Sequence, residues 1–468
     1  MNRQLILEGR EEGGPMVEVR APFDGRVVAT VAQASAAQVE RALAFAFAAR
    51  SRLQALSGLK RRAVLDGLVT RLTSGTEAMA QVICHEAGKP ITAARAEVGR
   101  AIETFRLASA ALASFGGSVV PVDLGAGSEG SEAEVRRFPA GVIVGVVPFN
   151  FPLNLGAHKV APALAVGAPI IVKPPPQAPS AQLMLAQMAL DAGADPAAFQ
   201  VLPCDNQVAE RLATDARVRV MSFTGSAKVG WHLKGLVKGK AVLELGGNAA
   251  AMVCADADLD KAASKLAVGG FVYAGQVCIK VQRIVVEAAV WERFVPRFLE
   301  EVSTLTVGDP ASEKTNIGPV IDRTSAERIE AWVDEAIAAG ATVLLRGARQ
   351  GLLIPPVVLT DVPRSTRAYA EEIFGPVVVL EKVADFAAGL EAVNASAYGL
   401  QAAVFTNDLQ KVRTAFHQLE VGGVIVNDAP SFRSDNMPYG GVKGSGLGRE
   451  GVRWAMEDFT EERVLVYN

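Results

Sequence analysis

One cysteine, Cys278, ends the segment AGQVC at 274–278 and precedes a run of β-branched residues. A cysteine in such a place is most often a small core residue, which is the alternative to any chemical role. The Ala-Gly-Gln stretch before it forms a small-residue turn that would let backbone N–H groups approach a reacting oxygen. A thiolate here could attack a carbonyl carbon and hold the acyl group as a thioester, so Cys278 is a candidate nucleophile. We expect Cys84, Cys204 and Cys254 to be core residues.

Two further side chains have the types that thioester chemistry needs. Glu244 in LELGGN stands between two leucines and before two glycines, where the backbone can bend sharply. Burial there would raise its pKa and make it a base that activates water near neutral pH. Asn150 in PFNFP stands where a predicted strand over 141–149 ends, and its amide N–H could stabilise negative charge on oxygen. The alternatives are a solvated glutamate at a strand end and an ordinary turn asparagine.

The segment FTGSAKVG, residues 223–230, is typical of a strand-to-helix turn, which is common and does not by itself indicate a nucleotide site. Ser226 and the free N–H groups of the helix could face a pyrophosphate, with Gly225 and Gly230 close by. The glycine spacing differs from the GxGxxG pattern of ordinary dinucleotide-binding domains. Lys173 ends the predicted strand APIIVK, at the sheet edge where ligands of parallel sheets bind, although a solvated cation is the alternative.

The elements that would position these residues alternate between strand and helix patterns, which predicts an α/β fold with parallel sheets. Segments 140–149, 168–174 and 218–226 are apolar on both faces and indicate central strands of a dinucleotide-type half. A second α/β region follows from about residue 245 to 440. Residues 36–56 predict an amphipathic helix, whose apolar stripe contains Val39, Leu43, Phe47 and Leu53.

Length and composition limit the function classes. A chain of 468 residues fits two sizeable domains. A net charge of -3 with interspersed signs offers no basic stripe, so we expect no nucleic-acid partner. The N-terminus has no signal-peptide pattern, and apolar runs are broken before the roughly 20 residues of a membrane span, so we expect a cytoplasmic protein without a membrane partner. Four scattered cysteines and four histidines predict neither a disulfide framework nor a metal site.

Seven segments, in their order along the chain, resemble the aldehyde dehydrogenase superfamily from about residue 20 to the C-terminus. They are PFNFP (148–152), VKP (172–174), FTGSAKVG (223–230), LELGGN (243–248), AGQVC (274–278), EEIFGPV (371–377) and MPYGGVKGSGLGRE (437–450). The resemblance implies two doubly wound parallel-sheet domains, a Rossmann-like cofactor domain and a catalytic domain, with a small β oligomerisation arm. It also implies NAD(P)+-dependent oxidation of an aldehyde to a carboxylic acid through a cysteine thiohemiacetal and thioester.

The resemblance assigns roles residue by residue. Cys278 becomes the nucleophile, Glu244 the general base, Asn150 an oxyanion donor beside the cysteine's own N–H, and Glu450 an outer proton-relay carboxylate. Cofactor binding is implied for Lys173, Gly225, Ser226, Gly230, Glu372, Phe374, Pro148 and Phe149. Phe149 stands where many relatives have Trp.

For three of these residues the resemblance implies which part of the cofactor they contact. Lys173 would bind the adenosine ribose. Glu372 and Phe374 would share one side of a strand-like segment beside the nicotinamide ribose and ring, the alternatives being an exposed acid and a core phenylalanine. The cofactor itself stays open between NAD and NADP. Many relatives that prefer NAD carry a glutamate three residues after the lysine, but this chain has Pro176, which removes a repulsion against a 2′-phosphate.

Substrate choice is predicted from three polar residues. Asn154 and His158 are four apart on one helix face directly after Asn150, and Arg433 lies in the loop APSFRSDNMP. His158 also suits a purely structural role in the helix. A polar wall favours a small hydroxylated or anionic aldehyde, of the lactaldehyde, semialdehyde or glyceraldehyde phosphate kind.

The predicted organisation is an NAD(P)-binding domain over 1–117 and 140–243, a catalytic domain over 244–444, and an oligomerisation arm from 118–139 and 445–468. The arm has β-prone edges with little core, so we expect a homodimer or homotetramer. A coenzyme A-acylating dehydrogenase and a non-catalytic structural relative are the alternatives to the hydrolytic enzyme.

Overall fold

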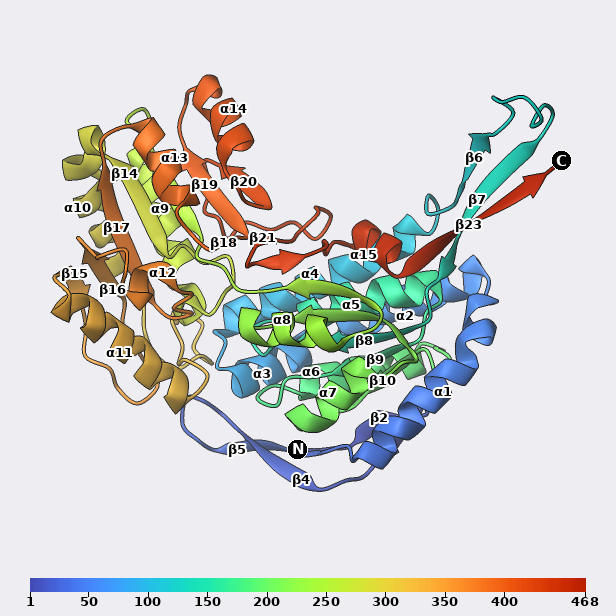
Figure 1. Cartoon of the computed structure of the whole chain (residues 1–468). Helices are drawn as coiled ribbons and strands as arrows, with labels where there is room; N and C mark the ends of the chain where they lie inside the picture. The colour runs from blue at the N-terminus through green and yellow to red at the C-terminus, as the bar shows by residue number, and fades with distance from the viewer.

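The computed structural model describes residues 1–468, and its first sheet contains the three strands predicted to be central (Figure 1). The strand order is β22-β12-β11-β8-β9-β10-β2-β3, and β12, β11, β8, β9 and β10 are parallel. The bounds are β2 (Leu5–Leu7), β3 (Arg10–Glu12), β8 (Val142–Val146), β9 (Ile170–Lys173), β10 (Phe199–Val201), β11 (Val218–Thr224), β12 (Lys240–Glu244) and β22 (Gly446–Leu447). β8 ends three residues earlier than predicted, because Pro148 has no N–H to extend the ladder.

Helices cover both faces of this sheet, which explains why its strands are apolar throughout. Ile143 of β8 packs into the core beneath α2, α4 and α5, whereas its neighbour Val144 packs into the core beneath α1. The helices are α1 (Ala36–Gln54), α2 (Gly58–Ser74), α3 (Thr76–Ala87), α4 (Ile91–Ala111), α5 (Asn154–Val166), α6 (Ser180–Asp191), α7 (Asn206–Thr214) and α8 (Ala227–Leu236). The dinucleotide-type half predicted from the sequence is therefore present.

Helix α1 matches its prediction in extent but not in every buried position. It begins with a capping box, in which Ser35 accepts from Gln38 N–H and the Gln38 side chain binds the Ser35 N–H. Phe47, which the sequence analysis placed on the buried stripe, is 37% exposed. The helical period brings Ala46 to the core instead, and the Arg50 guanidinium covers the Phe47 ring at 3.3 Å from its centroid.

The second α/β region is built on a seven-stranded sheet in the order β15-β16-β17-β14-β13-β19-β20, parallel except for β15. Its strands are β13 (Ala250–Val253), β14 (Arg283–Glu287), β15 (Thr342–Arg346), β16 (Val357–Thr360), β17 (Val377–Val383), β19 (Gln401–Phe405) and β20 (Gly423–Val426). Its helices are α9 (Leu259–Phe271), α10 (Trp291–Ser303), α11 (Arg323–Ala338), α12 (Arg367–Ala370), α13 (Phe386–Asn394) and α14 (Leu409–Gln418), with the short 3-10 helices η1 (Val272–Gly275) and η2 (Ala288–Val290). Figure 1 shows this domain as a separate lobe.

A three-stranded arm projects from the cofactor-type domain and carries the C-terminus at its tip (Figure 1). It consists of β6 (Ser118–Pro121), β7 (Glu132–Pro139) and β23 (Thr460–Tyr467), with β7 paired antiparallel to both neighbours. Its apolar side chains are largely exposed, with Val119 at 83% and Val464 at 64%. The arm therefore has no core of its own, although its role in assembly stays a prediction.

The stretch before β23 belongs with the first domain rather than with the arm in which the predicted boundary placed it. β22 pairs antiparallel with β12, and α15 (Val452–Asp458) packs against α5 and α4. This placement brings Glu450 from the C-terminal segment next to the ends of the central strands. The remaining strands form small sheets: β1 (Asn2–Arg3), β4 (Met16–Arg20) and β5 (Val27–Ala32) make one, and β18 (Tyr398–Gly399) and β21 (Val442–Lys443) make another.

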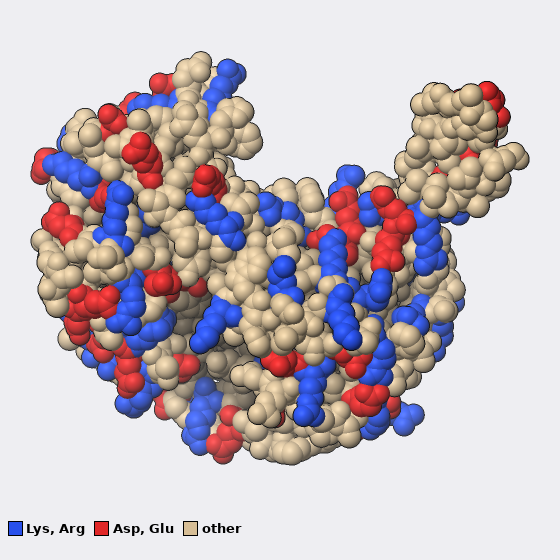
Figure 2. All heavy atoms as spheres, in the orientation of Figure 1, with Lys and Arg blue, Asp and Glu red and all other residues tan.

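The surface carries both signs of charge without a dominant patch on the face that Figure 2 shows. Lys and Arg side chains alternate there with Asp and Glu over both domains. None of the helices combines the length and the apolar character that crossing a membrane requires.

Candidate active site

Cys278 is held by a backbone turn that follows α9. Tyr273 and Ala274 adopt left-handed conformations with φ of 58° and 54°, and Gly275 follows with φ of 65°. Two successive non-glycine residues in this region store strain, which is typical of functional turns. A Cβ at Gly275 would lie 2.3 Å from the Gly375 carbonyl oxygen, so this position requires glycine. The turn leaves Cys278 half-buried.

Asn150 is attached directly to this turn. Its Nδ2 donates to the Gln276 carbonyl oxygen at 3.0 Å, and the side chain is buried. Gln276 is fixed in turn, because its Oε1 accepts from the Ile321 N–H at 2.8 Å. The segment that carries the predicted oxyanion donor and the segment that carries the predicted nucleophile are therefore joined by one hydrogen bond across the two domains.

A buried ion pair braces the same junction. Glu97 Oε1 accepts from the Leu153 and Asn154 N–H groups at the start of α5, at 2.9 and 3.1 Å, and its Oε2 binds Lys89 Nζ at 2.5 Å. The Lys89 ammonium lies 3.5 Å from the Phe151 ring centroid and 4.7 Å from that of Tyr273. Lys89 thus contacts one aromatic ring from each of the two segments. This pair was not predicted from the sequence.

Glu244 ends β12 and is buried, with neither carboxylate oxygen hydrogen-bonded. Burial raises its pKa well above the usual value, and the nearby Glu450 carboxylate raises it further. A Cβ at Gly440 would lie 2.8 Å from Glu244 Oε1, so the loop opposite leaves room for the carboxyl group. A buried carboxyl without a partner is free to bind and activate water.

The two glycines after Glu244 provide space rather than the sharp bend expected from the sequence. Neither has a positive φ. A Cβ at Gly246 would lie 2.0 Å from Glu372 Oε2, and one at Gly247 would lie 2.5 Å from the Cys278 carbonyl oxygen. The LELGGN motif therefore lets the Cys278 segment and Glu372 approach the end of β12.

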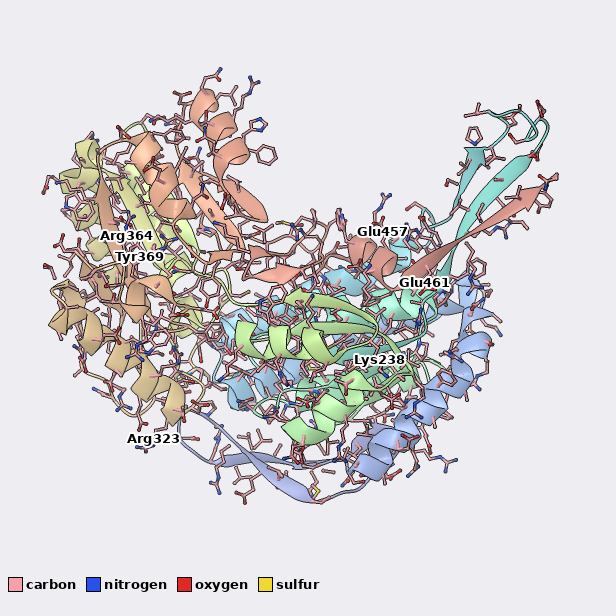
Figure 3. The ribbon with its side chains drawn as sticks, in the orientation of Figure 1. Lys238, Arg323, Arg364, Tyr369, Glu457 and Glu461 are labelled. Carbon is pink, nitrogen blue, oxygen red and sulfur yellow. The ribbon has the colours of Figure 1, made fainter.

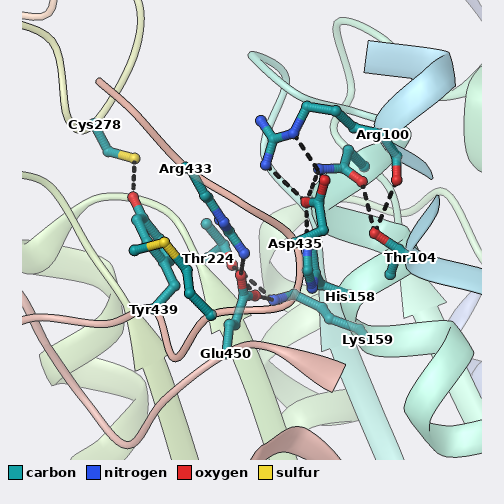
Figure 4. Close-up of polar contacts among 12 residues, drawn as sticks. Arg100, Thr104, His158, Lys159, Thr224, Cys278, Arg433, Asp435, Tyr439 and Glu450 are labelled. Atoms are coloured by element: carbon teal, nitrogen blue, oxygen red, sulfur yellow. Dashed lines mark hydrogen bonds and ion pairs between the residues drawn. The ribbon is translucent and has the colours of Figure 1, made fainter. Parts of the chain in front are cut away.

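Glu450 is the centre of a buried charged cluster (Figure 4). Its Oε1 accepts from Lys159 Nζ at 2.7 Å, and its Oε2 accepts from Arg433 Nη2 at 3.1 Å. Lys159 also donates to Thr224 Oγ1 at 2.7 Å. Burial would raise the pKa of Glu450, but Lys159 and Arg433 together hold it well below the usual value. Glu450 is thus ionised beside a Glu244 whose pKa is raised, which is an arrangement that suits proton transfer.

Two of the three predicted substrate residues, Asn154 and His158, contact a second carboxylate, Asp435. The third, Arg433, contacts Glu450. Asp435 Oδ1 accepts from Asn154 Nδ2 at 3.1 Å and lies 2.8 Å from His158 Nε2, and Arg100 binds both of its oxygens. Burial, followed by the charge of Arg433, lowers the pKa of His158, which favours the neutral ring. Asn154 and His158 are fully enclosed, whereas Arg100 keeps 30% of its side chain exposed.

On the cofactor side, Ser226 is the N-cap residue of α8, yet its side chain does not cap the helix and stays exposed. The two glycines of this motif serve packing, because a Cβ at Gly230 would lie 2.4 Å from Leu245 Cδ2 and one at Gly225 would lie 2.8 Å from the Phe223 ring. Lys173 ends β9 as predicted, is buried, and has its pKa lowered by that burial.

Glu372 and Phe374 lie in a loop before β17, not on the strand-like segment that was predicted. Phe374 has a left-handed φ of 46°, which turns the chain and breaks the alternation. Its ring meets that of Phe149, next to Pro148, edge to face at 6.0 Å. Glu372 Oε1 accepts from the Gly247 N–H at 3.1 Å, and burial raises its pKa to about 7.

Several residues of the site were missed, although some left a signal in the sequence. Lys159 is the one lysine or arginine in helix α5, which is apolar apart from Asn154 and His158, and a charge in such a helix indicates a buried partner. Asp435 lies in the loop that was already quoted for Arg433, and Tyr439 lies in the quoted segment MPYGGVKGSGLGRE. Arg100 left no comparable signal.

Residues 10–465 match the sequence model of the Aldehyde dehydrogenase family. A 3-sulfolactaldehyde dehydrogenase from Priestia aryabhattai is 40% identical over 467 residues, which cover 99% of this chain and 98% of the relative. The structure of aldehyde dehydrogenase 21 from Physcomitrella patens, in complex with the reaction product succinate, is 40% identical with a TM-score of 0.98 and covers 100% of this chain and 98% of that one. The glyceraldehyde-3-phosphate dehydrogenase from Methanocaldococcus jannaschii, complexed with NADP, is 36% identical with a TM-score of 0.93, over 98% and 99% of the two chains.

Proposed function

This chain belongs to the aldehyde dehydrogenase family, and on that premise we propose that it oxidises an aldehyde to a carboxylic acid through a thioester on Cys278. The family is NAD(P)-dependent, so the cofactor is NAD or NADP. One observation carries the proposal. The segment of Cys278 is joined to Asn150 by a hydrogen bond, and Glu244, near the same thiol, is a buried carboxyl without a partner.

The residues divide the chemistry between them. The Cys278 thiolate attacks the aldehyde carbon, and the Asn150 amide with the Cys278 N–H holds the oxyanion of the thiohemiacetal. NAD or NADP, held by Lys173 and the N-terminus of α8, would supply the hydride acceptor. Glu244 then takes a proton from water, which attacks the thioester and releases the acid. Glu450, with Lys159, provides a charged route along which the proton leaves Glu244.

The residues on the cofactor side fit a dinucleotide. The free N-terminus of α8, with the uncommitted Ser226 side chain, suits the pyrophosphate. Lys173, buried at the end of β9 without an ion-pair partner, suits the ribose hydroxyls. Pro176 is exposed and adds no carboxylate that would repel a 2′-phosphate, so we infer that NADP is accepted. Glu372 and the Phe149–Phe374 ring pair would border the nicotinamide end.

For the substrate we propose a small aldehyde that carries an anionic group. The cluster around Glu450 holds two cations, Lys159 and Arg433, which share this one carboxylate. Asp435 is balanced by Arg100. Arg433 Nε is buried without a hydrogen-bond partner, so an anionic group of the substrate would satisfy it. Three relatives support an anionic substrate. Two are named for 3-sulfolactaldehyde and glyceraldehyde-3-phosphate, and the structure of the third contains the reaction product succinate.

The test is aldehyde-dependent reduction of NAD or NADP, measured with and without coenzyme A. We expect activity that needs no coenzyme A, and we expect Cys278→Ser to abolish it while binding of the cofactor is retained. Substantial turnover by Cys278→Ser would refute the nucleophile assignment. Strict dependence on coenzyme A would favour the acylating alternative, and inactivity of the unmodified protein with every aldehyde would favour a structural role.

A further inference from the structure

The nucleophile has a hydrogen-bond partner that the mechanism above does not use. Cys278 Sγ lies 2.9 Å from the hydroxyl oxygen of Tyr439 (Figure 4). We propose that Tyr439 is a further catalytic residue, whose hydroxyl donates a hydrogen bond to the Cys278 thiolate and so favours the ionised nucleophile. The proposal rests on the assignment of Cys278 as the nucleophile.

The direction of the effect follows from the chemistry of the two groups. A thiol is a weak donor, so the neutral pair gains little from the contact. A phenol donates a strong, charge-assisted hydrogen bond to a thiolate. The contact therefore stabilises the ionised form more than the neutral form, which lowers the pKa of the Cys278 thiol.

Tyr439 is fixed in this position from three sides. Its N–H donates to the Glu450 carbonyl oxygen at 2.9 Å, and the Glu450 N–H donates back to the Tyr439 carbonyl oxygen at 2.6 Å. The guanidinium carbon of Arg433 lies 3.7 Å from its ring centroid. Ile279 and Leu400 pack with it in a small buried cluster. A ring held in this way keeps its hydroxyl at the sulfur atom without an entropic cost at each turnover.

The surroundings of the sulfur atom mostly disfavour the thiolate, and the hydrogen bond from Tyr439 opposes them. Burial raises the pKa of the Cys278 thiol to about 11, and the carboxyl groups of Glu372 and Glu244 also raise it. Only Tyr439 and, to a smaller extent, Arg433 act in the opposite direction. Burial and the neighbouring Cys278 raise the pKa of Tyr439 well above its usual value, so the phenol keeps its proton at physiological pH.

The experiment compares Tyr439→Phe with the unmodified enzyme by the rate at which iodoacetamide alkylates Cys278 between pH 6 and 10. In this reaction the thiolate displaces iodide, and the thiol proton goes to the buffer. Phenylalanine keeps the ring and its packing, so only the hydroxyl is lost. Because the pKa of the Cys278 thiol lies above this pH range, the rate at each pH follows the thiolate fraction. We expect alkylation at pH 8 to slow by roughly tenfold, which corresponds to a rise of about one unit in the pKa of the thiol. Mass spectrometry of the Cys278 peptide excludes signal from Cys84, Cys204 and Cys254, which are buried.

Tyr369→Phe is the matched control. Tyr369 is a tyrosine of the catalytic domain beside Arg364 (Figure 3), and its hydroxyl donates to Glu381 rather than to Cys278. We expect this variant to lose thermal stability but to keep the alkylation profile of the unmodified enzyme. An unchanged profile in Tyr439→Phe, or an equal shift in both variants, would overturn the proposal. Turnover by Cys278→Ser would overturn the proposed function instead, so the two failures are distinguishable.

Discussion

Removing the charge of Lys89 should destabilise the junction between the segment that carries Cys278 and the segment that carries Asn150. Lys89 and Glu97 are almost completely buried, with 1% and 0% of their side chains exposed. Lys89→Met leaves the Glu97 carboxylate without its cation, and breaking a buried pair in this way costs about 3 to 5 kcal/mol. For a domain of this size we expect the melting temperature to fall by roughly 10 °C. Burial also lowers the pKa of Lys89 to about 8, against the attraction of Glu97, which shows how strongly the site penalises a bare charge.

The double variant Lys89→Met/Glu97→Gln separates charge from geometry. Glutamine removes the unpaired charge, yet its Oε1 can still accept from the Leu153 and Asn154 N–H groups, so most of the lost stability should return. Lys382→Met serves as the control, because it breaks an exposed pair with Glu292 that is worth at most about 1 kcal/mol. The assay is thermal unfolding together with aldehyde-dependent NADP reduction. A melting temperature that is the same in Lys89→Met and Lys382→Met would refute the reasoning.

Three other predictions follow. Deleting residues 460–468 removes β23 and exposes the edge of β7, so light scattering should find a smaller or aggregated species; an unchanged oligomer would contradict the arm's role in assembly. Arg433→Met should lower kcat/KM for an anionic aldehyde by roughly 10- to 100-fold and change that for hexanal much less, and an equal loss for both would contradict a charge-based preference. Glu244 must be ionised to act as a base, and its pKa is raised by burial and by Glu450. Hydrolysis of a preformed acyl-enzyme should therefore accelerate as the pH rises through a value well above the usual range of a glutamate, and a rate that is already constant at pH 5 would contradict this assignment.

The strands and the motifs were predictable because their signals are local. Segments such as VIVGV are apolar on both faces, which indicates a central parallel strand whatever the rest of the chain does. The turns around Cys278 and Asn150 carry their glycine and proline residues next to the functional side chains. These features needed no knowledge of distant contacts.

The contacts between distant segments could not be predicted in the same way. Lys89 and Glu97 contact segments that follow residue 150, and Tyr439 reaches Cys278 from 161 residues away. Phe374 was misplaced because a left-handed φ broke an alternation that looked regular in the sequence. Phe47 was misplaced because an Arg50 guanidinium can cover an aromatic ring at the surface.

The central claim is a thioester on Cys278 that Glu244 helps water to hydrolyse, and trapping that thioester tests it most directly. Glu244→Gln keeps the size of the side chain but removes the base, so acylation should proceed while hydrolysis stalls. After mixing with an anionic aldehyde and NADP, intact-mass spectrometry should find the protein heavier by one acyl group, located on the Cys278 peptide, and Cys278→Ser should show no such adduct. An unmodified Glu244→Gln protein that turns over at the normal rate would contradict the account.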